Sequence, residues 1–449
     1  MYAIFFVILA QNCRELIMKH FPKAVVISIS SIVACQILLT NTSCMKKELY
    51  DPEIVDTIMS QASPVDRVDV THDWVMTRLS TYRIDANISV NAKEVQILTE
   101  NPRESGNATV INKTEISDGG HVSLAASYPL LKKKLYAALV DAGGAYTVTE
   151  FDVEAIQADF SNPLFVSENL AYKPLPQSYA FGYEEEFPEP GDYDYNDIVL
   201  HISQERAGTN VIRLNVQLAA VHSSRQLAAA IRIQDYSYDD IDSVKSESGV
   251  TFNDNIPSQI LTVMTDNVDQ LLLRGRNDEA VINLFADAHW ATGDNLTESY
   301  GVITRKNYNV SKGSDSKNQL IVPRTVSYLI YFKDSSQLNQ FSLDSLDPFM
   351  IESYNGSNWE VHLNEHRNAQ TLYEYTTQDL KNKHLPWALK VPTGLFRHPL
   401  KGVNIGFYIK DKEALFGAYP IRKHAFGEWS SDRTQSTDWY LYPQNNNVF

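Results

Sequence analysis

The residues best suited to chemistry lie in one acidic stretch, Asp192-Tyr193-Asp194-Tyr195-Asn196-Asp197. Side-chain oxygens stand at its first, third, fifth and sixth positions. A calcium ion takes about six to eight oxygen ligands at flexible geometry, and the first ligands of the helix-loop-helix calcium loop have the same alternate spacing. The glycine after the third ligand and the distant glutamate of that loop are missing here. We therefore expect a calcium loop of another type.

The chain on either side of this stretch must position its oxygens. Upstream, Glu184 and Glu185 can add ligands if the chain folds back at Pro188-Glu189-Pro190-Gly191. Downstream, apolar residues at alternate positions from Ile198 predict a strand. The acids repel one another without a cation, which supports bound Ca²⁺; an acidic turn whose Asp and Asn side chains cap their own backbone stays open as the alternative. The predicted calcium ligands are Asp192, Asp194, Asn196, Asp197, Glu184 and Glu185.

The same region carries a resemblance in three segments: Tyr183-Glu184-Glu185, Phe187-Pro188, and Gly191 to Val199. Together they resemble the signature of the LruC-domain family of bacterial envelope proteins, many of which are lipoproteins. Glu185 stands where that family usually has Asp, and Phe187 where it has Trp. Further segments match the family's order near the C-terminus: Asp347–Phe349, His362-Leu363, Leu385–Ala388, Ala418–Pro420, Phe426–Trp429 and Asp438–Tyr440. The resemblance implies a β domain from Tyr179 onward but no established biochemical activity.

The N-terminus has the pattern of a signal segment. An apolar run from Ala24 to Leu39 follows a basic start at Met18, so we expect that translation begins at Met18 and that residues 1–44 are the signal. Ser43-Cys44 at its end resembles the lipobox of bacterial lipoproteins, which predicts lipidation of Cys44. A transmembrane anchor is the alternative. The chain has three cysteines, all in this region, so its body has no disulfide framework: Cys13, Cys35 and Cys44.

Composition and periodicity predict a mostly β chain with two folded domains. Residues 45–79 are interpreted as a tether. Over 80–155, short strands with alternating apolar residues predict a small immunoglobulin-like β-sandwich. Prolines in 156–178 indicate a linker. Residues 179–449 are then expected to form a larger β-sandwich or jelly-roll-like LruC domain.

Several other kinds of chemistry are not expected. The formal charge is −16 and the body has no Lys/Arg cluster, which argues against nucleic acid as a partner. The sequence has no phosphate-binding glycine loop, His-Glu-x-x-His pair or Gly-x-Ser-x-Gly elbow. His362 and His366 have helix-like spacing without a helical pattern, which disfavours a zinc site. A second cation site in the loop with Asp235, Asp239, Asp240 and Asp242 is disfavoured because acid runs in loops are usually solvated.

These observations predict an envelope protein and not an enzyme. We expect a lipoprotein of the outer membrane, on its periplasmic or surface-exposed face, anchored through Cys44 and stabilised by Ca²⁺. It is expected to bind a glycan or another surface protein. Trp and Tyr residues could line a sugar-binding face, although a buried aromatic core is their more frequent use. Two alternatives stay open: a glycan-acting hydrolase with carboxylates in a cleft, and a structural or assembly subunit of a surface fibre.

Overall fold

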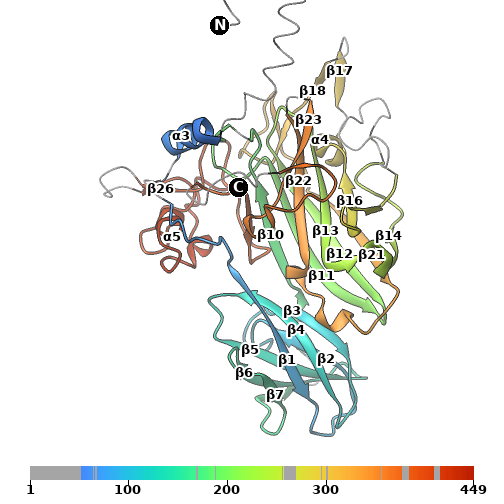
Figure 1. The fold of residues 1–449 in the computed structure, drawn as a ribbon. Coiled ribbons are helices and arrows are strands. Elements are labelled where there is room, and N and C mark those ends of the chain that lie inside the picture. Colours follow the sequence, from blue (N-terminus) through green and yellow to red (C-terminus); the bar gives the residue numbers. More distant parts are fainter. Residues whose placement is uncertain are drawn as a thin grey trace, which may run out of the picture. The chain divides into compact units, whose positions relative to one another are not determined.

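The computed structural model of the chain describes residues 52–449, except 64, 66–67, 168–169, 188, 255, 257–268, 295, 300–301, 355, 377–383 and 409–414. The predicted signal segment 1–44 with Cys44, the start of the predicted tether, and Pro188 lie outside the described residues. Residues from Ile58 to Phe449 form one compact unit. Strands dominate it (Figure 1), which confirms the predicted mostly β fold. Within the described residues, no helix is long and apolar enough to cross a membrane.

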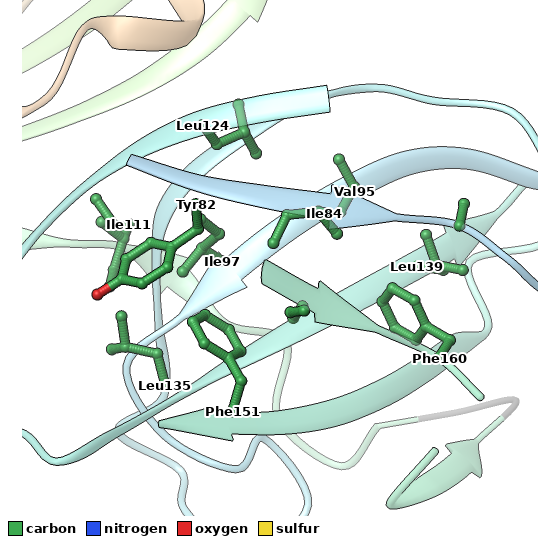
Figure 2. Close-up of a cluster of buried hydrophobic side chains, with 14 of the residues drawn as sticks. Tyr82, Ile84, Val95, Ile97, Ile111, Leu124, Leu135, Leu139, Phe151 and Phe160 are labelled. Atoms are coloured by element: carbon green, nitrogen blue, oxygen red, sulfur yellow. The ribbon is translucent and has the colours of Figure 1, made fainter. Parts of the chain in front are cut away.

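Residues 77–176 form a small β-sandwich, here called the small module. One of its sheets has the strand order β4-β1-β7, and the other has the order β8-β6-β5-β2-β3-β9. The strands are β1 (Thr77–Asp85), β2 (Ala92–Leu98), β3 (Thr109–Glu115), β4 (His121–Pro129), β5 (Lys134–Asp141), β6 (Tyr146–Asp152), β7 (Gln157–Asp159), β8 (Phe165–Ser167) and β9 (Leu175–Pro176). Apolar side chains from both sheets, such as Ile84 of β1 and Leu139 of β5, form one buried core, which Figure 2 shows.

The segment 156–178, predicted as a linker, contributes three short strands to this module. β7 pairs in parallel with β1, β8 pairs antiparallel with β6, and β9 pairs in parallel with β3. β9 is the outermost strand of its sheet. Pro176 is tolerated there because an edge strand can spare a backbone N–H. The prolines of this segment thus lie in or near short edge strands. These strands are too short to show an alternating apolar pattern in the sequence.

Residues 178–449 form the large module, which has two main sheets (Figure 1). The first has the order β14-β21-β12-β11-β10-β25, with β19 paired to β12 and β20 paired to β19. Its strands are β10 (Ser178–Tyr183), β11 (Ile198–Gly208), β12 (Val211–Val221), β14 (Ile241–Ser246), β19 (Asn307–Tyr308), β20 (Asn318–Gln319), β21 (Arg324–Phe332) and β25 (Ala388–Val391). In β21, alternate residues from Val326 to Phe332 are buried, which is the pattern of a strand with one face on the core.

The second main sheet has the order β15-β16-β13-β22-β23-β24. Its strands are β13 (Leu227–Ser237), β15 (Leu272–Arg274), β16 (Glu279–Phe285), β22 (Leu346–Tyr354), β23 (Ser357–Val361) and β24 (Tyr375–Thr376). The Tyr183 hydroxyl of β10 donates to the Pro348 carbonyl of β22 at 2.7 Å, which links the two sheets. Outside these sheets, and besides short 3-10 helices, the described residues form two hairpins and three α-helices. The hairpins are β17 (Thr297–Ser299) with β18 (Val302–Thr304) and β26 (Phe407–Tyr408) with β27 (Leu415–Phe416), and the helices are α3 (Pro52–Ala62), α4 (Ala288–Ala291) and α5 (Phe426–Ser431).

The later part of the predicted tether is packed against the fold. His72 and Trp74 are buried, with their rings stacked at 4.0 Å between centroids. His72 Nε2 lies 3.1 Å from the backbone oxygen of Trp429 in α5. Trp429 and Trp439 are themselves buried, at 2% and 0% exposure. These aromatic residues form core and not an open sugar-binding face, and apolar burial is the physical reason that the tether segment is ordered here.

A buried ion network joins strands of the second sheet. His362 Nδ1 lies 2.9 Å from Asp347 Oδ2, and its Nε2 lies 3.0 Å from Glu360 Oε2. Arg232 Nη2 lies 2.8 Å from the same Asp347 oxygen. Burial alone would lower the pKa of His362, but the charges and hydrogen bonds of Asp347 and Glu360 raise it to about 9. His362 is therefore held as an imidazolium, and neither nitrogen is left to bind zinc together with His366.

Replacing His362 with glutamine should destabilise the protein at neutral pH. The pKa of this histidine rises from 6.5 to about 9 on folding. Its contribution to stability is therefore complete below pH 6.5 and is lost as the pH rises through about 9. The shift corresponds to roughly 3 kcal/mol of unfolding free energy, and the variant also removes a positive charge from between the buried carboxylates of Asp347 and Glu360. Urea unfolding at neutral pH and above pH 9 measures both effects.

The matched control is His424→Gln. His424 Nδ1 also pairs with a carboxylate, Asp438, at 2.7 Å, but both side chains are partly exposed. Such a pair is worth less than about 1 kcal/mol. Equal losses in the two variants, or an unchanged pH dependence in His362→Gln, would contradict a buried imidazolium.

Candidate metal centre

The acidic stretch forms the loop between β10 and β11, and the buried side chain of Glu184 sets its conformation. One carboxylate oxygen accepts the backbone N–H of Tyr193 at 2.9 Å, and the other accepts the N–H of Tyr195. Gly191 passes so close that a Cβ there would lie 2.2 Å from Glu184 Oε2. A side chain at this position would displace the Glu184 carboxylate. Glu184 thus organises the loop through its backbone N–H groups.

Two tyrosines give the loop an uncommon backbone. Tyr193 and Tyr195 have φ of +55° and +51°, a region that costs a non-glycine residue about 1–3 kcal/mol. Both rings are buried. The Tyr195 hydroxyl donates to the Pro386 carbonyl at 2.8 Å, and the Tyr193 carbonyl accepts the N–H of Ile405 at 2.7 Å. Burial of the rings and these contacts offset the backbone strain.

Two buried side chains of the loop have an oxygen without a hydrogen-bond partner. Asp194 Oδ1 accepts the N–H of Asn196 at 3.1 Å, while Asp194 Oδ2 has no partner. Asn196 Nδ2 donates to the Pro399 carbonyl at 3.0 Å, while its Oδ1 has none. A buried polar atom left unsatisfied costs about 1–3 kcal/mol. A cation at these oxygens would remove that cost.

His222 joins the loop from the end of β12, and the sequence analysis missed it. Its Nδ1 lies 3.5 Å from Asp194 Oδ2 and 3.9 Å from Asp197 Oδ1, and it has no hydrogen-bond partner. The signal was available in the hairpin formed by β11 and β12. Ile198 and Val221 are opposite each other in its register, so the residues just outside the pair, Asp197 and His222, must meet.

Asp192, Asp194 and His222 are the core of the candidate site. Each offers a ligand atom, and these atoms all lie within 4.8 Å of one another. Asp192 is exposed and borders a cavity of about 530 Å³ that Glu185 also lines. In the part of the chain that the structure describes, no other group of three such residues brings its ligand atoms so close.

The electrostatics of the loop favour a bound cation. Burial, and then the charge of Asp192, raise the pKa of Asp194 well above its ordinary value. Burial and the charge of Glu184 do the same for the pKa of Asp197. Burial lowers the pKa of His222, which keeps its imidazole neutral and able to bind metal. These carboxyl groups are costly to ionise without a compensating charge, which a bound cation would supply.

The predicted ligands thus divide into two groups. Asp192 and Asp194 meet at the candidate site, with Asp197 and the unpartnered oxygen of Asn196 in the same loop. Glu184 binds backbone N–H groups. Glu185 accepts the Ser223 hydroxyl and donates its own N–H to Asp197 Oδ2 at 2.6 Å. Oxygen donors fit Ca²⁺, whereas the imidazole nitrogen suits zinc or another transition metal.

The acids of the 235–242 loop are engaged in other contacts. Asp239 Oδ1 lies 2.9 Å from Arg274 Nη2. Asp240 Oδ2 accepts the backbone N–H of Ser237 at 2.7 Å, so it caps the short turn after β13. Asp235 belongs to β13 and Asp242 to β14, so the predicted loop is only the short turn between these strands.

Comparison with known proteins adds a family. Residues 210–440 match the family described as a domain of unknown function, DUF4842. No curated protein is detectably similar in sequence. A solved structure from Bacteroides ovatus, described as a "putative lipoprotein", is similar with a TM-score of 0.43 and 12% identity, over 80% of this chain and 99% of that one.

Replacing Gly191 with alanine should damage the loop. The new Cβ would lie 2.2 Å from Glu184 Oε2, so the carboxylate would have to leave the backbone N–H groups that it binds. We expect the unfolding free energy, measured by urea unfolding, to fall by about 1–3 kcal/mol. The control is Gly313→Ala, because a Cβ at Gly313 has no atom within 4 Å. Similar stability of the two variants would show that Glu184 does not organise the loop.

Proposed function

The chain belongs to the DUF4842 family, and we propose that it is a lipid-anchored, non-catalytic protein of the bacterial cell envelope whose acidic loop binds a calcium ion. Its LruC-like signature supports assigning the domain from Tyr179 onward to the LruC type. We propose that the protein binds a glycan or another surface protein from the outer membrane, on its periplasmic or surface-exposed face.

The observation that carries the calcium proposal is the buried carboxylate of Asp194. It is 0% exposed and has an oxygen without a partner, beside the acid Asp192 and the neutral imidazole of His222. Leaving this carboxylate charged and uncompensated in the interior would be very costly. A divalent cation supplies the missing charge and the missing contact together.

Calcium is proposed over a transition metal because most donors in the loop are oxygens. Carboxylates, an amide oxygen and water from the adjoining cavity match its preference for about six to eight oxygen ligands. His222 supports the alternative, since imidazole is a common ligand of zinc and manganese-type sites and a rare one of calcium. The ion therefore has to be identified by experiment on His222.

Membrane attachment is supported by the sequence alone. The apolar run that ends before Ser43-Cys44 fits a lipoprotein signal, and Cys44 is the last cysteine of the chain. A lipid on its sulfur would hold the folded modules at the membrane surface through the segment that follows.

A second candidate function is glycan hydrolysis, and one observation favours it. The cavity beside the loop is lined by five acids, Glu184, Glu185, Glu186, Asp192 and Asp197, and paired carboxyl groups in a cleft are what glycosidases use. Burial raises the pKa of Glu185, as a general acid requires. We favour the cation because Asp192 of this cavity also lies beside the buried carboxylate of Asp194. A fibre-subunit role remains a third hypothesis, and a missing strand filled by another copy would support it.

Calcium should stabilise the wild type, and Asp194→Ala should abolish that response. At about 100-fold excess over Kd, an ion that binds only the folded state adds roughly 2.7 kcal/mol, a rise of a few degrees in Tm. Asp239→Ala is the control: it removes an exposed pair with Arg274 and should keep the full response. Thermal unfolding with calcium and with chelator measures both. A response lost in Asp239→Ala and kept in Asp194→Ala would place the ion in the other loop.

His222→Ala identifies the ion. If oxygens hold calcium, the variant should keep most of the calcium-dependent rise in Tm. If wild type responds to zinc or manganese but not to calcium, and His222→Ala loses that response, the ion is a transition metal and the calcium assignment is wrong.

Lipidation should depend on Cys44. Cells expressing the full chain and fed a clickable palmitate analogue should label the wild type and leave Cys44→Ser unlabelled. Cys35→Ser is the control and should label normally, because its sulfur lies inside the predicted signal. Equal labelling of wild type and Cys44→Ser would rule out this anchor.

A further inference from the structure

A second cavity, of about 750 Å³, lies between the small module and the first sheet of the large module. Its volume falls within the range of about 300–1,000 Å³ that small-molecule sites occupy. Its floor is the outer face of the central strands β11, β12 and β21, and its rim includes the segments around Leu395 and Leu441. The cavity shares no lining residue with the cavity beside the acidic loop.

The floor is a grid of neutral polar side chains. His201 is opposite Gln217, which is opposite Thr325, in three adjacent strands. In the neighbouring row, Ser203 is opposite Asn215. Directly opposed residues of adjacent strands lie about 4.5–5.5 Å apart. The floor therefore presents amide, hydroxyl and imidazole groups at regular intervals in two directions.

These groups already form hydrogen bonds within each row, between adjacent strands. Asn215 Nδ2 donates to Ser203 Oγ at 3.2 Å, and Gln217 Nε2 donates to Thr325 Oγ1 at 3.3 Å. Such bonds fix the orientation of the side chains before a ligand arrives, which lowers the entropy cost of binding. His201 Nε2, in contrast, is buried without a partner. The side chains of the grid are thus held in fixed orientations, and at least one of their polar atoms still lacks a hydrogen-bond partner.

The cavity carries almost no free charge. Among the described residues that line it, the charged ones are Glu100 and Lys132, which form an ion pair with each other. Burial lowers the pKa of His201 to about 4, so its ring is neutral at physiological pH. An anionic or cationic ligand would find no counter-charge here, and this disfavours acidic polysaccharides, nucleotides and charged peptides.

A peptide in extended form also fits poorly. β12 lies between β11 and β21, and β11 and β21 each have a second neighbour in β10 and β14. None of the three floor strands has a free edge, so a peptide cannot add to that sheet. The outermost strand β9 also borders the cavity, but it is only Leu175–Pro176, and Pro176 has no N–H to donate. The rim offers exposed apolar side chains instead, with Leu395 at 74% and Leu441 at 55% exposure.

We propose that this cavity binds a neutral oligosaccharide. Sugar hydroxyl groups both donate and accept hydrogen bonds, as the amides and hydroxyls of the floor do. The C–H faces of a sugar ring can contact the leucines of the rim. The inference deepens the proposed function, because it assigns a glycan as the partner and names where it binds.

The test uses the full chain on an array of neutral and charged glycans, followed by calorimetry with the best neutral oligosaccharide. We expect binding to at least one neutral glycan, with an affinity that high salt leaves unchanged. Gln217→Ala should weaken it by about 3–10-fold, since one hydrogen bond contributes roughly 0.5–1.5 kcal/mol. Thr325→Trp, at an exposed strand position, should fill the cavity and abolish binding.

The control is Gln157→Ala, an exposed glutamine on β7 outside the cavity, which should bind like wild type. Retention of charged glycans only, of peptides only, or of no glycan overturns the inference. So does neutral-glycan binding that both cavity variants keep, although the proposed binding function would then stand with another site. Cleavage of the bound glycan would keep the cavity as a glycan site but refute the non-catalytic proposal. The calcium responses of Asp194→Ala are independent of all these outcomes.

Discussion

The fold around the acidic loop depends on one carboxylate. Glu184 is fully buried, and its pKa is raised first by this burial and then by the charges of Asp194 and Asp192. It is kept there because it binds the backbone N–H groups of Tyr193 and Tyr195, which the left-handed loop leaves without partners in a strand or helix. Backbone groups in the interior must be paired, so the loop and this glutamate require each other.

The loop in turn is where distant parts of the chain meet. The Glu184 N–H donates to the Trp387 carbonyl at 2.8 Å, and the Tyr193 carbonyl receives the Ile405 N–H at 2.7 Å. Asn196 reaches the carbonyl of Pro399. A cation in this loop would therefore stabilise contacts between β10, β11 and the C-terminal third of the chain, and not just a surface turn.

Sequence reasoning reached the strands and the acidic loop for different reasons. Strands such as Arg324–Phe332 bury alternate residues and are rich in β-forming residue types, so the mostly β fold could be predicted. Asp192 and Asp194, which the alternate spacing singles out, also lie close together in the structure. The roles of Glu184 and His222 could not be predicted from spacing. Glu184 binds backbone N–H groups because Tyr193 and Tyr195 adopt positive φ, and His222 lies beside the loop because of the register of β11 and β12. The paired edge strands of 156–178 are too short for any periodic signal.

The junction of the two modules has a consequence for how the protein comes apart. Asn112 Nδ2 of β3 lies 3.2 Å from the carbonyl oxygens of both Asn339 and Phe341 in the large module. Ser127 Oγ lies 2.7 Å from the Tyr179 hydroxyl, with both residues buried. Opening this junction alone would leave those polar groups unpaired. The modules should therefore unfold in one cooperative transition, and a protease cutting between them would leave two fragments that stay associated until both lose their structure.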